Sequence, residues 1–293
     1  MGAGQTMSFV NTFVQGTLLG GLYALYAAGL ALIFGVMRLV NLGHGDLIVL
    51  AAYLLLALST AVALPLPVAL LIALPFLFAL GWALQRTVLN RTLESGLLVP
   101  LLVTFGLSII IQNGLLLVFS ADSRRLSLGA LETASVSVGG ITMGVVPLLT
   151  FGCAVLVCLG LTLVFYRTPL GRVLRATSDS PQIVQLMGID PRTVFAIAMG
   201  ICFVVLTLAA FFMGVRANFD PSAGPARLLF AFEAVVIGGL GSFWGTLAGG
   251  IILGIAQTIG ATINPEWQQL AGHLVFLVVI LVRPRGLFPR GAA

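Results

Sequence analysis

Long apolar stretches constrain this chain of 293 residues more than any other feature. A helix needs about 20 apolar residues to cross the hydrocarbon core of a bilayer. Suitable runs fall at about 10–36, 47–63, 67–85, 97–119, 144–166, 193–215 and 267–282. A further run of 36 residues, Leu228 to Ile263, is broken at 238–242 and is expected to form two segments. We therefore predict an all-α polytopic membrane protein, with about eight to nine transmembrane helices, Gly-broken segments and one domain over residues 1–293.

The composition leaves little room for a water-soluble domain or an ATPase site. Charged residues make up 8% of the chain, against roughly 25% in a soluble domain. Every basic residue is Arg, and a P-loop needs a Lys for the nucleotide phosphates. We therefore expect no cofactor on this chain. Cys153, Cys158 and Cys202 lie inside apolar runs, as small buried side chains do.

The arginines predict the orientation in the membrane, because cytoplasmic loops carry an excess of Arg and Lys. With the N-terminus outside and strict alternation, ten arginines face the cytoplasm and four face the periplasm. The cytoplasmic set is Arg38, Arg86, Arg91, Arg167, Arg172, Arg175, Arg192, Arg283, Arg285 and Arg290. Since these residues flank membrane segments, nucleic acid is not an expected partner. The C-terminus is predicted to be cytoplasmic.

The loop 167–192 is a polar segment between two apolar runs, and its interior has the marks of a short helix. Ser180 is suited to cap the helix, and Pro181 is suited to its first position. Gly188 can adopt the left-handed conformation that is common at the end of a helix. Helical spacing places three apolar side chains on one face: Ile183, Leu186 and Met187. A small amphipathic helix beside the membrane must bury that face in headgroups or in another protein.

Two segments are expected to break helices at membrane depth. In the first, Asn41 and Asp46 flank His44 and are predicted to satisfy free backbone groups. No cluster of ligands surrounds His44 or the isolated His273, so neither a metal site nor catalysis is expected. The second break holds Gly238, Gly239 and Gly241.

Glu233 lies five residues before the second break, inside an apolar run. An acid in a membrane helix is a candidate proton or cation site. The favoured alternative is a carboxylate that is bonded to helix ends near the break or is simply placed near the membrane interface.

Glycines repeat every four residues on two segments: Gly16 and Gly20, and Gly241, Gly245 and Gly249, continued by Gly250 and Gly254. Such stripes let helices approach closely. They predict a tight bundle that also meets a second membrane subunit.

Three stretches together resemble the permeases of branched-chain amino acid ABC importers. They are Met37 to Asp46 (MRLVNLGHGD), Gly171 to Asp190, and Val236 to Ser242 (VIGGLGS) with the glycines that follow. The tail RPRGLF, at 283–288, is also typical, and the similarity extends from about Ser8 to this tail. Leu42-Gly43 departs from the family, which often has Ala or Phe after the first Asn.

The resemblance implies a permease subunit in the bacterial inner membrane, contacting lipid. Its implied partners are a second related permease, two cytoplasmic ATPase subunits that hydrolyse ATP, and a periplasmic binding protein. The solute stays open among branched-chain amino acids, urea and short amides. In the family, the segment matching 172–190 is the helix that couples to the ATPase. Here it would use Arg172, Arg175, Ser180, Pro181, Ile183, Leu186, Met187 and Gly188.

Two rival functions remain. A stand-alone secondary transporter or channel would use Glu233 as its ion site. An intramembrane hydrolase ranks last, because His44 and His273 are the chain's only histidines. The residues expected at the translocation path or at helix breaks are Asn41, His44, Asp46, Glu233, Gly238, Gly239 and Gly241.

Overall fold

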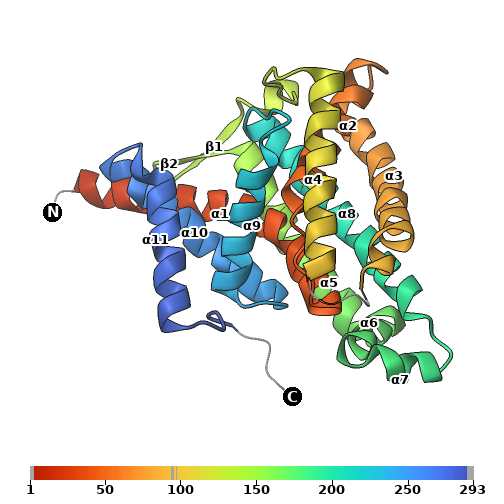
Figure 1. Cartoon of the computed structure of the whole chain (residues 1–293). Helices are drawn as coiled ribbons and strands as arrows, with labels where there is room; N and C mark the ends of the chain where they lie inside the picture. The colour runs from red at the N-terminus through yellow and green to blue at the C-terminus, as the bar shows by residue number, and fades with distance from the viewer. Residues whose placement is uncertain (1–2, 94–95, 97, 289–293) are drawn as a thin grey trace.

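The computed structural model describes residues 3–93, 96 and 98–288, and it is helical over most of that length (Figure 1). The N-terminal part comprises α1 (Ala3–Met37), α2 (His44–Thr60), α3 (Leu66–Thr87), the 3-10 turn η1 (Leu89–Arg91) and α4 (Leu98–Phe119). A loop follows with η2 (Gly129–Leu131), β1 (Ser135–Val138) and β2 (Ile141–Gly144). The rest is α5 (Val145–Arg167), α6 (Pro169–Asp179), α7 (Pro181–Leu186), α8 (Pro191–Arg216), α9 (Gly224–Gly238), α10 (Phe243–Ile263) and α11 (Trp267–Val282).

Among the described residues, six helical segments are long and apolar enough to cross a membrane: α1, α3 with η1, α4, α5, α8 and α10. The apolar helices α2 and α11 are shorter, at 17 and 16 residues, and α9 has 15. The predicted all-α polytopic class is confirmed. The run from Leu228 to Ile263 divides between α9 and α10, at the glycines predicted to break it.

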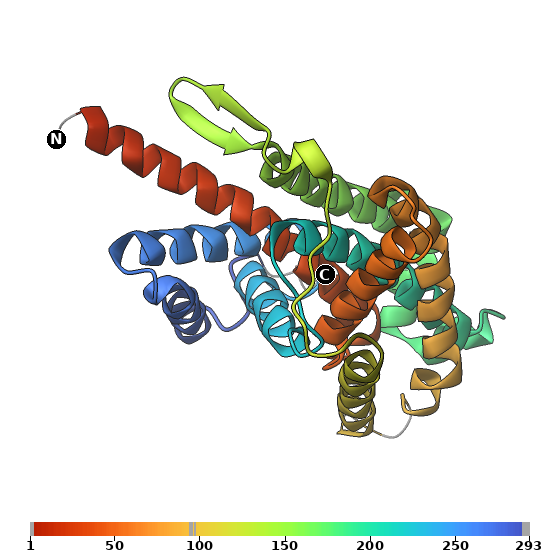
Figure 2. The same cartoon turned by 90° about the horizontal axis from the view of Figure 1, so that it is seen from above.

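Two helices form the centre of the bundle. The spans of α1 and α8 are mostly buried, and α1 packs against α5, α8, α9 and α10. By contrast, α3, α4 and α5 leave most of their apolar surface exposed, as lipid-facing helices do. Seen from above, the N-terminal half of α1 projects beyond this centre, beside the β-hairpin (Figure 2). Gln15 donates to the Thr142 carbonyl at 2.9 Å and joins the two.

The glycine stripes pack against each other within the chain. A Cβ on Gly16 would lie 2.7 Å from Cα of Ile255, and one on Gly250 would lie 2.6 Å from the Gly20 carbonyl oxygen. Gly249 packs in the same manner against the backbone of α9, where its Cβ would lie 2.7 Å from the Gly238 nitrogen. The tight bundle predicted from these stripes is confirmed. The second membrane subunit that the bundle was also expected to meet stays a prediction.

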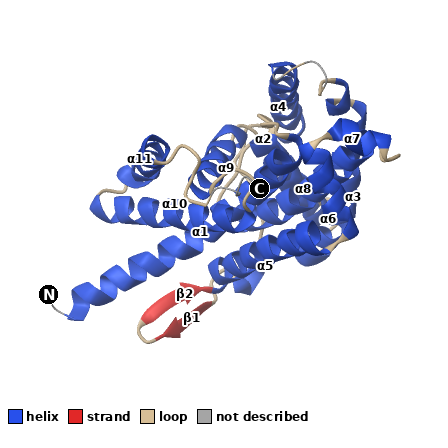
Figure 3. Ribbon diagram, turned by 90° about the horizontal axis from the view of Figure 1, so that it is seen from below, coloured by secondary structure: helices blue, strands red, loops and turns tan. Residues whose placement is uncertain are grey.

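A β-hairpin not predicted from the sequence follows η2 and lies beside α5 (Figure 3). The strands are antiparallel, with Ser135 opposite Gly144. The connecting residues Gly139 and Gly140 have φ of 58° and 85°. Two consecutive left-handed residues are what a two-residue hairpin turn requires. The Gly-Gly pair after the alternating segment Ser135–Val138 was the signal that would have identified it.

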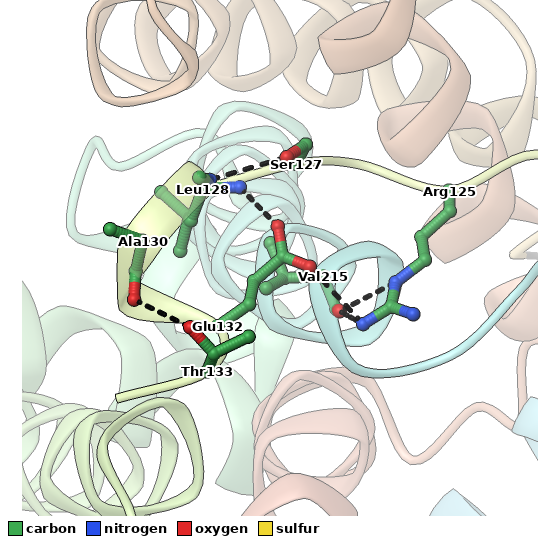
Figure 4. Close-up of polar contacts among 8 residues, drawn as sticks. Arg125, Ser127, Leu128, Ala130, Glu132, Thr133 and Val215 are labelled. Carbon is green, nitrogen blue, oxygen red and sulfur yellow. Dashed lines mark hydrogen bonds and ion pairs between the residues drawn. The ribbon is translucent and has the colours of Figure 1, made fainter. Parts of the chain in front are cut away.

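Arg125 fastens the loop before this hairpin to the end of α8 (Figure 4). Its guanidinium donates to the Val215 carbonyl at 3.1 and 3.2 Å and lies 3.2 Å from the Glu132 carboxylate. Glu132 also accepts from the Leu128 amide at 2.6 Å, and this hydrogen bond is the main reason that the pKa of Glu132 is lowered. The side chain of Arg125 therefore stabilises its own loop.

Candidate functional site: the polar loop and two helix breaks

The polar loop 167–192 contains two helices where the sequence predicted one. The additional helix, α6, begins at Thr168, whose hydroxyl oxygen accepts from the Gly171 amide at 3.1 Å. Gly171 lies so close to the end of α5 that a Cβ would approach the Phe165 carbonyl carbon to 2.5 Å. Ser178 then donates to the Gly35 carbonyl at 2.9 Å, which attaches α6 to the end of α1. The loop is thus fixed to the bundle.

Arg172 and Arg175, which were predicted to contact the ATPase, differ in their surroundings. Arg175 places its guanidinium carbon 5.2 Å from the centre of the Tyr166 ring, so it stacks on the end of α5. Arg172 is exposed on α6. Of the two, Arg172 is the one available to another molecule.

The short helix α7 exposes the three apolar side chains that were predicted to share a face. Ile183, Leu186 and Met187 are 61%, 88% and 74% exposed, whereas Val184 is 3% exposed and attaches α7 to the bundle. Pro181 occupies the first helical position as predicted. Ser180 is the residue before the helix, but its hydroxyl accepts no backbone N–H. The predicted side-chain cap is therefore wrong.

Gly188 ends α7 in the left-handed conformation that was predicted, with φ of 83°. The Gly188 amide donates to the Gln185 carbonyl at 3.0 Å, and the Ile189 amide donates to the Val184 carbonyl at 3.3 Å. This pair of hydrogen bonds is a Schellman motif, which satisfies the last carbonyls of a helix.

Asp190 caps the start of α8. Its carboxylate accepts from the Thr193 hydroxyl at 2.8 Å and the Arg192 amide at 3.0 Å. These hydrogen bonds, that from Thr193 first, lower the pKa of Asp190. Pro191 follows at the first helical position, as the sequence indicates. The capped start fixes the direction in which the polar loop leaves the bundle.

The first helix break begins deep inside the bundle. The His44 ring donates from Nε2 to the Tyr26 carbonyl at 2.8 Å. Tyr26 lies eleven residues before the end of α1, about 16 Å back along that helix. The segment 38–43 therefore runs back beside α1, and α2 starts at the depth of Tyr26. The predicted break at membrane depth agrees with this path.

The polar side chains at this break are satisfied in different ways. Asn41 accepts from the Gly43 amide at 2.9 Å, as predicted. Asp46 was also expected to accept from backbone groups, and its carboxylate does bond to its own backbone amide at the start of α2. It accepts in addition from two side chains of α4, Ser108 at 2.6 Å and Gln112 at 2.9 Å, which were not predicted.

Sequence reasoning missed the polar side of α4. Thr104 accepts from the Leu42 amide at 3.2 Å, so Thr104, Ser108 and Gln112 all bind the first break. Their spacing of four residues inside an apolar run places them on one helical face, and this was the available signal.

The second break is held by the C-terminal tail. Gly239 and Gly241 have φ of 106° and 81°, which glycine adopts without strain. The amides of Leu287 and Phe288 donate to the carbonyls of Ile237 and Gly238, at 2.9 and 3.0 Å. The freed carbonyls at the end of α9 thus receive partners from the tail.

Glu233 and His273 form a polar pair between α9 and α11. Nδ1 of His273 contacts Oε1 of Glu233, a side chain that is 1% exposed. His273 was predicted to be isolated, which is wrong. The predicted bonding of Glu233 to helix ends is also wrong, because its partner is the side chain of His273. Forty residues separate the two, so only the packing of α11 beside α9 brings them together.

Several of the arginines that were predicted to face the cytoplasm lie at one end of the bundle. Arg86 donates to Thr193 at 3.0 Å, and Asn90, beside Arg91, donates to the Arg192 carbonyl at 3.1 Å. The α6 helix, with Arg172 and Arg175, is attached to the end of α1 beside Arg38. Figure 1 shows α6, α7 and the C-terminal tail at one end and the loop after α4 at the other. Arg290 lies outside the described residues.

Comparison with known proteins gives matches over nearly the whole chain. The family model described as "Branched-chain amino acid transport system / permease component" matches residues 12–282. BraD of Pseudomonas aeruginosa, a high-affinity branched-chain amino acid transport system permease protein, is 28% identical over 96% of each chain. LivH of Escherichia coli K12, which carries the same description, is 28% identical over 98% of this chain and 97% of its own.

LivM of the same bacterium, a further permease protein of that transport system, is 28% identical over 42% of this chain and 29% of its own. No solved structure matches the chain. The family model spans the first break, the polar loop and the second break, and the chain therefore belongs to the branched-chain amino acid transport permease family.

Proposed function

We propose that the chain is the transmembrane permease subunit of a binding-protein-dependent ABC importer for branched-chain amino acids. Full-length similarity to BraD and LivH supports the substrate class. The sequence contains no Lys, and a P-loop needs that residue, which supports the proposal that other subunits bind and hydrolyse the ATP. Transport is the activity, and the ATP is hydrolysed by two separate cytoplasmic subunits.

The observation that carries this proposal is the exposed apolar face of α7. Leu186 is 88% exposed on a helix that is anchored by Val184 and ended by Gly188. An apolar face on a fixed support fits a groove on a partner, and buried apolar anchors contribute most to such interfaces. We assign the coupling contact with the ATPase to Arg172, Arg175, Ser180, Pro181, Ile183, Leu186, Met187 and Gly188. Movement of the ATPase dimer would reach the bundle through α6 and α8.

The second permease is proposed as a related chain, because this chain is similar to both LivH and LivM of one bacterium. A periplasmic binding protein would deliver the solute. The grouping of arginines at the α6–α7 end favours a cytoplasmic location for that end in the bacterial inner membrane. The N-terminus would then be periplasmic and the C-terminus cytoplasmic.

The two helix breaks are proposed to border the translocation path. The first break meets α9, the helix that ends at the second break: a Cβ on Gly45 would lie 2.7 Å from the Leu228 nitrogen near the start of α9. Interrupted helices that meet inside a bundle are a common way to build transport paths. The path residues would be Asn41, His44, Asp46, Glu233, Gly238, Gly239 and Gly241.

Reconstitution in liposomes tests the proposal. The chain with its permease partner, ATPases and binding protein should take up L-leucine only when ATP is supplied. The same assembly with the P-loop lysine of the ATPase replaced is the matched control and should be inactive. Leucine uptake by this chain alone, driven by a proton or sodium gradient, would instead support the stand-alone carrier.

A further inference from the structure

The pair formed by Glu233 and His273 leaves one strong acceptor without a partner. Oε1 of Glu233 is hydrogen-bonded to Nδ1 of His273. Oε2, in contrast, is buried and has no hydrogen-bond partner among the described residues. A buried carboxylate oxygen without a donor costs free energy, more so than a neutral group. The site is therefore suited to a ligand that brings a positively charged donor.

The His273 side of the pair is open to water or to a passing solute. Its side chain is 37% exposed, although it lies six residues inside the apolar helix α11. Ionisable side chains in membrane segments face the interior of a bundle or a hydrated cavity, since exposure to lipid is costly. The exposed edge of His273 thus points to a hydrated surface beside α9 and α11.

Aromatic rings form a wall next to the carboxylate. Phe230 lies one helical turn before Glu233, with its ring centre 6.4 Å from that of His273 and at an angle of 12° to it. The ring centre of Tyr23 lies 5.0 Å from that of Phe230. The Tyr23 hydroxyl donates to Oε1 of Gln257 at 2.5 Å, which holds the ring in place. Aromatic faces attract organic cations and do not compete for their hydrogen bonds.

We propose that Glu233 is a transient binding site for the α-ammonium group of an amino acid on its way through the membrane. Oε2 accepts one ammonium N–H, while the rings of Phe230 and Tyr23 face the rest of the charge. His273 is a positioning residue that holds the carboxylate through Oε1. This inference rests on the proposed function, since it names a contact within the path of an amino acid importer.

The absence of Lys supports this ligand chemistry. No side chain of the protein supplies an ammonium group, and arginine, the cation present, is planar and larger. An amino acid, in contrast, brings a compact ammonium with three donors. A single contact of this kind is weak enough to release the solute, as a transport path requires.

Nitrogen-15 spectra of the histidines test the site directly, because the full chain contains only His44 and His273. The labelled chain in bilayers is titrated with L-leucine, with methylammonium chloride, and with 4-methylpentanoate, which is leucine without its ammonium group. We expect both ammonium compounds to shift the His273 signals and 4-methylpentanoate to leave them unchanged. His44 is fully buried and bonded to Tyr26, so its signals before any probe is added report that the chain is folded.

Glu233→Gln should weaken the response of His273 to leucine by about tenfold, the loss expected for one hydrogen bond to a charged group. Glu266→Gln, at an exposed site beyond the bundle, is the matched control and should respond like the wild type. Equal shifts with 4-methylpentanoate or sodium chloride, or no shift with any probe, would overturn the proposal. Since this measurement needs neither ATPase nor binding protein, it can fail while ATP-driven uptake succeeds, and the reverse also holds.

Discussion

Single glycines decide how closely the helices of this protein approach. On α10, Gly250 places its backbone against Gly20 of α1, and a Cβ there would lie 2.6 Å from a carbonyl oxygen. Because that oxygen belongs to a helical backbone, it cannot move aside like the end of a side chain. Gly152 of α5 has the same helical conformation but meets no neighbouring atom within 4 Å. The same residue type is thus essential at one site and dispensable at the other.

Gly250→Ala should therefore destabilise the bundle, while Gly152→Ala should not. We expect Gly250→Ala to lower the free energy of unfolding by about 1–3 kcal/mol, the usual cost of overpacking. Gly152→Ala should leave it unchanged or raise it by up to about 1 kcal/mol, because alanine is the better helix former. Unfolding in mixed micelles with increasing SDS measures both. Equal losses in the two variants would contradict the proposed α1–α10 contact.

In α7, one buried side chain attaches the helix to the bundle, and other side chains are free to contact a partner. Val184 is buried, whereas Ile183, Leu186 and Met187 project outwards. A polar substitution at an outward position therefore removes no contact within the chain. This arrangement allows docking to be disturbed without disturbing the fold.

Leu186→Asp should abolish coupling without affecting membrane insertion. We expect ATP-driven uptake by the assembled transporter to fall at least about tenfold, as for the loss of a central apolar contact in an interface. Gln185→Asp introduces the same side chain on the opposite side of α7 and should retain uptake. Co-purification of the ATPase with each variant provides a second readout. Normal uptake with Leu186→Asp would refute the assignment of α7.

The start of α8 should depend on pH through Asp190. Its pKa is lowered in the folded chain by the Thr193 hydroxyl and the Arg192 amide. A lowered pKa means that the carboxylate stabilises the fold fully above its ordinary value of 3.8, and that this contribution is lost as the pH falls through the folded value. The protection of the first turn of α8 against amide exchange, relative to the intrinsic rate at each pH, should therefore fall on acidification.

Asp190→Asn keeps a capping oxygen without the titrating charge, so its exchange should respond less to acid. Asp190→Ala removes the cap and should cost about 1 kcal/mol at neutral pH. A wild-type pH response identical to that of Asp190→Asn would show that another group is responsible.

Across the whole molecule, the two ends differ in charge and in structure. One end carries α6, α7 and arginines on several helices, and the other carries η2 and the β-hairpin. Reporter fusions should distinguish them. Alkaline phosphatase inserted between Gly139 and Gly140 should be active, since that enzyme matures only in the periplasm, and green fluorescent protein fused after the tail should fluoresce. The opposite pattern would invert the proposed orientation and place α7 beyond the reach of an ATPase.

The sequence was most informative where a property is carried by neighbouring residues. Apolar runs predicted most helix ends to within a few residues, and Gly188 marked a real helix end. It was least informative about partners distant in the chain. The bonds of Asp46 to Ser108 and Gln112 were not predicted, and His273 was left without Glu233. Pattern alone also missed α6, whose start depends on the close approach of Gly171 to α5.

Sequence alone determined that this chain is a helical membrane protein without a P-loop lysine. The length of each apolar run and the identity of each residue are visible in the sequence without knowledge of the fold. The exposure of α7, the mutual contact of the glycine stripes and the burial of Glu233 beside His273 were decided only by tertiary structure. The physical reason is that exposure and pairing are properties of helices packed together. A periodic pattern shows which residues share a face of a helix, but only packing shows what that face meets.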